Sequence, residues 1–392
     1  ISIALYSICV FKIPHLSSEY SLAVLGVFLI TFRTFCIDWF YQGIEQYSYI
    51  TVRTLVIRCL MVAFIFLSIH SSEDYFIYGI SCVIMDTGAS ICNLWNLRKH
   101  VNLKKVKKIQ IRKHLKPIFI FFLSSIAINI YNQIDVTMIG WIKNAAETGF
   151  YEYGIKPVKV IWTVLIGLTS VVMPRIVSCI EQKREDEEEK IRKKTIQGIF
   201  LLAVPITIFL FSISKELILF LFGSSYLISV YVFKVFVFAI IPVALSNYFA
   251  NIILLPHGKE KQRAWSVNIG LIVDIILNAM LIPAYGAIGA AVATLCTEII
   301  VCLGLMCCSV SYLKNVFIDF NWMPKMIILM TCVVLGNIIS WIPITNFLLK
   351  IVMAVIIYGL GYSIILLVVR EPLYTSQLKK IRNILVRKHE LK

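Results

Sequence analysis

Long runs of apolar residues, separated by short polar links, recur along the whole chain. The runs are about 18–25 residues long, which is the length at which an α-helix crosses the hydrocarbon core of a bilayer. The pattern therefore predicts an all-α polytopic membrane protein. About twelve spans are expected, at 1–13 (truncated), 20–42, 52–70, 75–96, 117–140, 151–175, 196–214, 230–255, 264–283, 286–309, 325–343 and 347–369.

The composition agrees with this class. The 392 residues are 59% hydrophobic and 15% charged, whereas a soluble domain averages about 25% charged residues. The 11 Cys are scattered through the apolar runs without metal-binding spacing, so we interpret them as small buried hydrophobic residues. No metal site and no cofactor is expected. The chain begins at Ile1 inside an apolar run, and we expect it to be a fragment that lacks its N-terminus.

Basic residues gather in every second link. The links after odd-numbered spans contain only Lys12, Lys143 and Lys215, and the other links and the tail hold most of the 38 Lys and Arg. By the positive-inside rule this bias predicts a multi-pass membrane protein with a cytoplasmic C-terminus. Because the basic residues flank spans, they favour contact with anionic membrane lipids and not with nucleic acid.

The most basic link divides the chain. Two similar helix bundles with a site between them are a common transporter plan. The predicted parts are 1–96 as the remainder of an N-terminal six-helix bundle, 97–116 as a basic cytoplasmic linker, 117–309 as a C-terminal six-helix bundle, 325–369 as two extra helices, and 370–392 as a basic cytoplasmic tail.

An aspartate stands near the end of an apolar run in IYNQIDVTMIGWI (130–142). A charged side chain inside a bilayer costs about 3 kcal/mol on insertion scales, so it usually faces a cavity or a partner. At 100° per residue, Asn129, Asn132 and Asp135 lie on one side of the helix. The span 117–140 is therefore predicted to have a polar side.

The next span carries a narrower polar stripe. Its members lie within roughly 60° of one another and are Glu152, Lys156, Lys159, Thr163 and Ser170. Asp135 and Lys156 fall at a similar depth on consecutive antiparallel helices. They could form a structural ion pair, or they could line a hydrated cavity that holds an anionic substrate. The stripe favours the cavity, because a lone ion pair needs no further polar neighbours.

Other charged residues within spans are weaker candidates. Arg33, near the middle of its span, could face the same cavity. Asp274 and Asn278, four residues apart, face one way, and with Glu298 they are expected to bond between helices and not to carry ions. No GxxxxGK[ST] motif occurs, so no ATPase activity is expected.

The stretch LLPHGKEKQRAWSVNIGLIVDIILNAMLIPAYGAIGAAVAT (254–294) resembles the polysaccharide-biosynthesis flippases, the Wzx type, of the multidrug/oligosaccharidyl-lipid/polysaccharide (MOP) exporter superfamily. Shorter stretches are also similar: DWFYQGIE (38–45), NQIDVTMIG (132–140), TGFYEYGIKPVKV (148–160), VVMPRIVS (171–178) and LFGSSY (221–226). The resemblance covers most of 20–310. Asp274 departs from the family pattern, in which Asn is expected.

The resemblance implies a MATE-like transporter of two six-helix bundles around a central cavity, often with 14 helices in all. It implies no enzyme, but a flippase that moves undecaprenyl-pyrophosphate-linked oligosaccharide to the outer leaflet for capsule, O-antigen or exopolysaccharide synthesis. Polysaccharide polymerase and chain-length machinery are the implied protein partners. Asp135 and Lys156 would then lie on the first two helices of the second bundle, which border the cavity.

The resulting hypothesis is alternating access. Lys156 and Lys159, with Arg33 if it faces inward, hold the pyrophosphate, and Asp135 pairs with the lysines when the site is empty. One alternative is a MATE-type drug or cation antiporter, although a cationic drug prefers an acid-rich cavity and this stripe is net basic. Another alternative is a membrane polysaccharide polymerase or ligase, which typically needs a large external loop with Arg or His. The longest external link, 215–229, lacks both.

Overall fold

The computed structural model describes residues 2–12, 20–44, 46–71, 74–101, 133–318, 322–344, 346–372 and 374–375. Within these ranges the regular structure is helical. The chain divides into two compact units, which we name the first unit (Ile1–His114) and the second unit (Leu115–Lys392). Each unit is described by itself.

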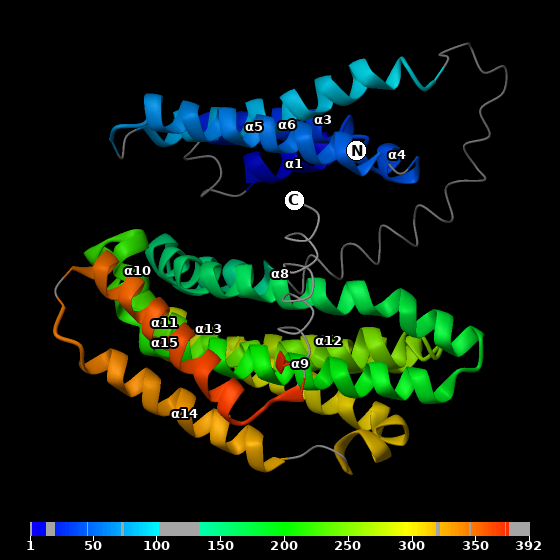
Figure 1. The fold of residues 1–392 in the computed structure, drawn as a ribbon. Helices are drawn as coiled ribbons and strands as arrows, with labels where there is room; N and C mark the ends of the chain where they lie inside the picture. Colours follow the sequence, from blue (N-terminus) through cyan, green and yellow to red (C-terminus); the bar gives the residue numbers. More distant parts are fainter. Residues whose placement is uncertain are drawn as a thin grey trace, which may run out of the picture. The chain divides into compact units, whose positions relative to one another are not determined.

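The first unit contains five described helices, drawn in blue to cyan in Figure 1. Helix α6 packs against both α3 and α5, and the short α4 lies in the connection between α3 and α5. The bounds are α1 Ser2–Lys12, α3 Tyr20–Thr34, α4 Asp38–Gly43, α5 Tyr47–Ser68 and α6 Tyr75–Leu97.

The second unit is a larger bundle in which α8, α9, α11, α12 and α13 pack against one another. A helix at 133–142 precedes α8. The further bounds are α8 Ala145–Glu181, α9 Glu185–Ser212, α10 Ser214–Phe222, η2 Ser224–Tyr226, α11 Leu227–Phe236, η3 Val237–Ala239, α12 Ile240–Tyr248, the π-turn η4 Phe249–Leu254, α13 Glu260–Ile318, α14 Trp322–Trp341 and α15 Phe347–Val368.

Helix α13 is folded back on itself. Its 59 residues would reach about 90 Å if straight, at 1.5 Å per residue. Gly286 breaks the helix with φ 55° and ψ −132°, a conformation that suits a residue without Cβ. A Cβ on Gly270 would collide with Val301, and one on Gly304 would press on Ser266. The two arms are therefore antiparallel and closely packed, and they correspond to the two predicted spans 264–283 and 286–309.

Nine helices in the described part of the chain are long and apolar enough to cross a membrane. The two arms of α13 count once in that number, and α1 has only 11 residues. Most of the predicted span 117–140 lies outside the described residues. The predicted fold class, an all-α polytopic membrane protein, is confirmed, whereas the predicted domain boundaries stay predictions.

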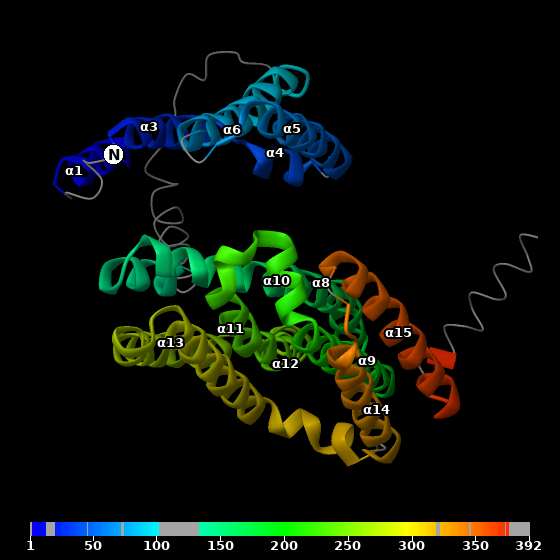
Figure 2. The same ribbon diagram turned by 90° about the vertical axis from the view of Figure 1, so that its left-hand side faces the viewer.

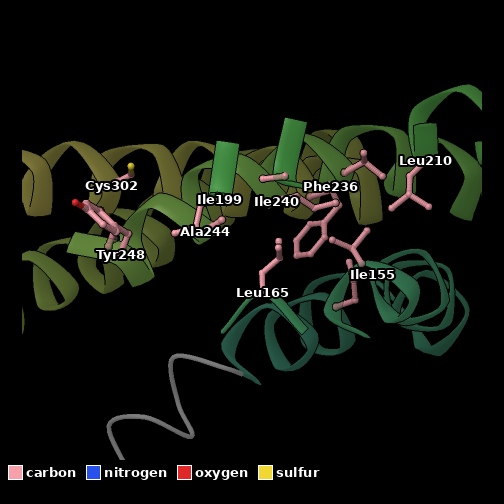
Figure 3. Close-up of a cluster of buried hydrophobic side chains, with 14 of the residues drawn as sticks. Ile155, Leu165, Ile199, Leu210, Phe236, Ile240, Ala244, Tyr248 and Cys302 are labelled. Atoms are coloured by element: carbon pink, nitrogen blue, oxygen red, sulfur yellow. The ribbon is translucent and has the colours of Figure 1, made fainter. Parts of the chain in front are cut away.

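The core of the second unit fills the space between α8 and the helices that face it. Figure 3 shows Ile155 and Leu165 of α8 pointing toward Phe236 and Ile240. These side chains are almost fully buried. The buried side of α8 is thus fixed by close apolar packing, which determines which of its residues remain exposed.

Helices α14 and α15 dock on α9 through a second apolar cluster, seen side by side in Figure 2. Pro205 lies inside α9 and has no N–H, so the carbonyl of Leu201 loses its helical partner. The Tyr362 hydroxyl donates to that carbonyl at 2.6 Å, and the Tyr358 hydroxyl donates to the carbonyl of Pro205 at 2.9 Å. The docking helix therefore satisfies a backbone group that the proline leaves free.

Candidate functional site

Asp135 lies in the helix at 133–142 with only 9% of its surface exposed. Its Oδ2 accepts hydrogen bonds from the Tyr151 hydroxyl at 2.6 Å and from the Thr294 hydroxyl at 3.0 Å. Its Oδ1 accepts from Nδ2 of Asn278 at 2.8 Å. The aspartate thus faces α8 and both arms of the α13 hairpin, and its three donors are uncharged.

A second carboxyl group lies beside the first. Asp274, one helical turn before Asn278, is 3% exposed and accepts from the Thr297 hydroxyl at 3.0 Å. It lies close enough to Asp135 for the two carboxyl groups to interact electrostatically. The Asn278 side-chain oxygen is buried and accepts no hydrogen bond within the described part of the chain. We name this set the carboxylate cluster: Asp135, Tyr151, Asp274, Asn278, Thr294 and Thr297.

The carboxylate cluster has no basic member. Within the described residues, no Lys, Arg or His forms an ion pair with Asp135 or Asp274. Two neighbouring carboxylates in a low-dielectric interior repel each other strongly, so both cannot be ionised without a counter-ion. The arrangement can therefore bind one proton, or one small cation that accepts oxygen ligands, and release it when the hairpin or α8 moves.

The predicted polar stripe lies on the exposed side of α8, opposite to its packed side. Lys156, Lys159 and Thr163 are exposed, and the Lys156 ammonium lies 3.4 Å from the Glu152 carboxylate and 4.4 Å from the centre of the Tyr153 ring. The stripe thus places polar side chains on an exposed side of α8 that also presents apolar residues such as Val160 and Val164.

The predicted pairing of Asp135 with Lys156 and Lys159 is wrong. Asp135 bonds Tyr151, which is on the buried side of α8, whereas the lysines are on the exposed side. The sequence places Asp135 and Lys156 at a similar depth in the membrane. The Lys156 side chain nevertheless points to a different side of α8 from the side that contacts Asp135. Tyr151 and Lys156 are five residues apart, which is about 140° around a helix.

The structure brings three further predicted cavity residues into neither the carboxylate cluster nor the exposed stripe of α8. Arg33 is exposed on α3 of the first unit. Asn129 and Asn132 lie outside the described residues. The interhelix hydrogen bonds expected for Asp274 and Asn278 are present, to Thr297 and Asp135. The expected bonding of Glu298 and the expectation that these residues carry no ion stay predictions.

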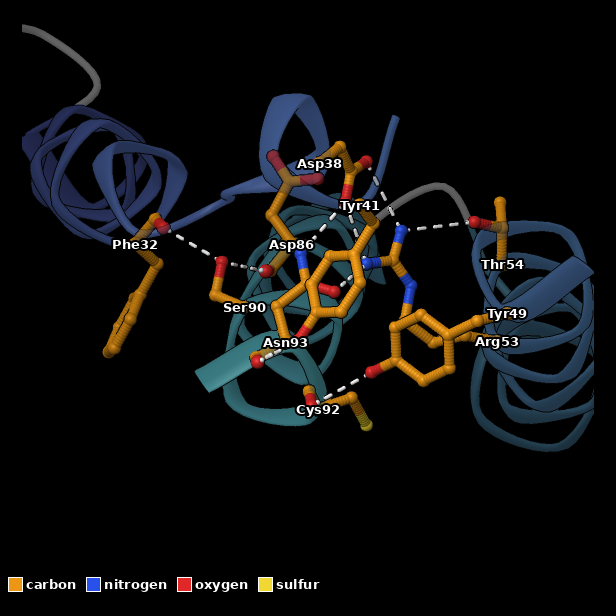
Figure 4. Close-up of polar contacts among 10 residues, drawn as sticks. All are labelled: Phe32, Asp38, Tyr41, Tyr49, Arg53, Thr54, Asp86, Ser90, Cys92 and Asn93. Carbon is orange, nitrogen blue, oxygen red and sulfur yellow. Dashed lines mark hydrogen bonds and ion pairs between the residues drawn. The ribbon is translucent and has the colours of Figure 1, made fainter. Parts of the chain in front are cut away.

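The sequence analysis missed a buried cluster in the first unit, shown in Figure 4. Arg53 lies inside α5 with its side chain 6% exposed. Its guanidinium bonds both oxygens of Asp38, at 2.7 and 3.2 Å, and also bonds the side-chain oxygen of Asn93. Asn93 donates to Asp38 at 2.8 Å, and the Tyr41 hydroxyl donates to the Asn93 carbonyl at 2.6 Å. We name this set the arginine cluster.

The sequence did offer a signal for the ion pair of this cluster. Asp38 is near the end of one predicted span and Arg53 is near the start of the next, and such positions are neighbours when consecutive spans are antiparallel. Sequence distance alone did not reveal it. Asn93, contributed by α6, lies 40 residues away from Arg53.

The chain is similar in sequence to proteins of polysaccharide biosynthesis. Residues 1–180 match the family model described as polysaccharide biosynthesis protein. The chain is 22% identical over 278 residues to a putative O-antigen transporter of Escherichia coli (strain K12), covering 67% of the chain and 64% of that relative. It thus spans a little less than two thirds of that relative's length. The resemblance to polysaccharide-biosynthesis flippases is confirmed.

Two further matches agree. A putative O-antigen transporter of Shigella dysenteriae is 23% identical over 324 residues, 78% of this chain and 76% of that protein. A probable low-salt glycan biosynthesis flippase of Haloferax volcanii is 24% identical over 215 residues, covering 53% of the chain and 44% of the relative. A solved structure of the lipid II flippase MurJ, in an inward closed conformation, matches 93% of this chain and 86% of its own with a TM-score of 0.56 and 18% identity. The fold is thus similar to that of this flippase structure.

Proposed function

We propose that the chain is a flippase for a lipid-linked oligosaccharide, which it transfers from the cytoplasmic to the outer leaflet. The observation that carries the proposal is the exposed face of α8. Lys156 and Lys159 lie on that face within a helix long enough to span a membrane. Charges at such positions are costly unless they face water or a partner of opposite charge. A lipid pyrophosphate is such a partner, because Lys offers compact positive charge to phosphate oxygens.

The carboxylate cluster supplies a means of coupling. Uptake of a proton or small cation between Asp135 and Asp274 removes the repulsion between them and favours the packed form of α8 on the α13 hairpin. Release favours a rearrangement of the same helices. Because Tyr151 of the cluster and the lysines belong to one helix, a shift of α8 would move the basic face as well.

The orientation follows the distribution of basic links, with the C-terminal tail in the cytoplasm. The O-antigen named for the relatives from Escherichia coli and Shigella dysenteriae points to surface polysaccharide synthesis and to a bacterial cytoplasmic membrane. On this proposal the polysaccharide polymerase and the chain-length machinery act on the outer product and are functional partners. The exposed basic face favours an anionic substrate over the cationic substrate of a drug antiporter.

The test measures the leaflet in which the glycan lipid resides. Deletion of the gene in its host should trap lipid-linked oligosaccharide on the cytoplasmic side, and the full-length gene should reverse this. The variant with Lys156→Ala and Lys159→Ala should fail to reverse it. A matched control is Lys190→Ala, an exposed lysine in the charged N-terminal part of α9, which should behave as wild type. Normal leaflet distribution after deletion, with no redundant flippase in the host, would overturn the proposal.

A further inference from the structure

A polar pocket of about 250 Å³ opens where α9 ends and α10 begins. Its walls come from four helices: Phe211 and Ser212 of α9, Lys215 and Glu216 of α10, Lys234 of α11 and Asn337 of α14. It lies apart from the carboxylate cluster and from the exposed face of α8, with which it shares no residue. Its volume is several times the ~30 Å³ that one water occupies in the liquid.

The pocket carries uncompensated positive charge. Glu216 is the acidic residue of its lining, and its carboxylate is bound to the Lys350 ammonium of α15 at 2.8 Å, with both side chains largely buried. Lys215 and Lys234 form no ion pair within the described residues. The Lys234 ammonium lies 5.7 Å from the centre of the Phe211 ring. The net charge of the lining is therefore positive.

The position of Lys234 makes its positive charge energetically unfavourable. It lies ten residues into a candidate span, Ser224–Leu254, and is only half-exposed. A cation within a span is energetically costly, and an aromatic ring at this distance offsets only part of that cost. A bound anion would remove the remainder.

The hydrogen-bonding groups of the lining define the anion. The Ser212 hydroxyl donates to the Ile208 carbonyl at 2.8 Å, and the nearby Ser340 hydroxyl donates to the Asn337 carbonyl at 2.7 Å. Their protons are therefore engaged. The other side-chain donors of the lining are the two ammonium groups, the Ser214 hydroxyl and the Asn337 amide. Together they suit a compact ligand that accepts hydrogen bonds and carries negative charge. A phosphate group has these properties.

We propose that this pocket binds the phosphate of a membrane lipid. Lys215 lies in a link with few basic residues, so the pocket opens toward the outer leaflet if the orientation proposed above holds; the binding itself does not depend on that function. The phosphate can come from an anionic phospholipid headgroup or from a polyprenyl phosphate. Both sources present the same chemistry to Lys215, Lys234 and Asn337.

The experiment is lipid binding to the purified full chain, measured by native mass spectrometry. Phosphatidylglycerol, polyprenyl phosphate and zwitterionic phosphatidylcholine are added separately at equal concentration. We expect at least tenfold greater retention of one or both anionic lipids than of phosphatidylcholine. Preference for phosphatidylglycerol would identify the phospholipid as the source, and preference for polyprenyl phosphate would identify the carrier lipid. Equal retention of all three lipids would overturn the proposal.

Variants locate the site. The double change Lys215→Gln and Lys234→Gln should reduce the anionic preference at least tenfold, and Lys234→Arg should retain it because the charge remains. Lys215→Glu changes an exposed position and provides the same test if the double variant does not fold. Lys261→Gln, at an exposed lysine outside the pocket, is the matched control. Wild-type preference in both the double variant and Lys215→Glu would overturn the assignment. If the leaflet assay shows no flipping while the purified chain still prefers anionic lipids, only the proposed function is contradicted.

Discussion

Each unit holds an aspartate in a hydrogen-bonded cluster, and the two aspartates are neutralised differently. The Asp38 side chain is 33% exposed, whereas Asp135 is 9% exposed. In the arginine cluster of the first unit, Asp38 accepts two hydrogen bonds from the guanidinium of Arg53. In the carboxylate cluster of the second unit, Asp135 accepts only from uncharged groups and has a second carboxyl, Asp274, as neighbour. The first arrangement is electrically complete within the protein. The second needs a proton or a cation from outside, so it can respond to an ion gradient while the first can only hold helices together.

The largest expected effect is the loss of the buried guanidinium. Arg53→Met should lower the free energy of unfolding by about 2 kcal/mol, because it removes the charged hydrogen bonds to Asp38 and leaves the buried Asn93 side-chain oxygen without its donor. Thermal unfolding of the purified protein in detergent measures this as a lower melting temperature. The double variant Arg53→Met and Asp38→Asn removes both charges and should recover most of the loss. A double variant as unstable as the single one would show that the ion pair is not the cause.

A change in the carboxylate cluster should affect stability less and ion response more. Asp135→Asn keeps the side-chain shape and removes the repulsion with Asp274, so we expect a free-energy change of no more than about 1 kcal/mol. The melting temperature of the wild type should vary with pH or with Na⁺, and that of Asp135→Asn should vary much less. Asp274→Asn should give the same flattening. A destabilisation by Asp135→Asn as large as that of Arg53→Met would remove the distinction between the two clusters.

The exposed ion pair between Lys156 and Glu152 should contribute much less to stability than the pair between Arg53 and Asp38. The side chains of Lys156 and Glu152 are 53% and 39% exposed, and such pairs contribute about 0–1 kcal/mol. Lys156→Ala should therefore leave the melting temperature nearly unchanged, and flipping should fall at least tenfold. The check combines thermal unfolding with the leaflet assay. A loss of stability equal to that of Arg53→Met would show that this lysine is structural.

The smallest expected effect is in the loop before α6, outside the membrane spans. Hydrogen bonds from the backbone N–H groups of His70 and Ser71 lower the pKa of the exposed Asp74 below its usual value near 3.8. A lowered pKa means that these bonds stabilise the loop above that value and are lost as pH falls through the lowered pKa. Protection of the two amides from hydrogen exchange should decrease at that acidic pH. In Asp74→Ala, protection should already be low at neutral pH.

The sequence alone predicted most of the long apolar helices that the structure describes, and their alternation across the membrane stays a prediction. Transfer of apolar residues from water to lipid is a local property, so a run of about 20 such residues identifies a span without knowledge of its neighbours. The same holds for the polar stripe of α8, because helical periodicity places Lys156, Lys159 and Thr163 on one face. The turn at Gly286 was also visible as the boundary between two predicted spans.

Only the tertiary structure decided which buried charges meet. The partners of Asp135 lie as far as 143 and 159 residues away in sequence, and the rotation of each helix about its axis is set by the packing of its apolar side. The prediction of equal depth for Asp135 and Lys156 could not reveal that Ile155 and Leu165 turn the lysines away from the aspartate. Partner choice depends on that rotation, which is a property of the packed bundle and not of any single helix.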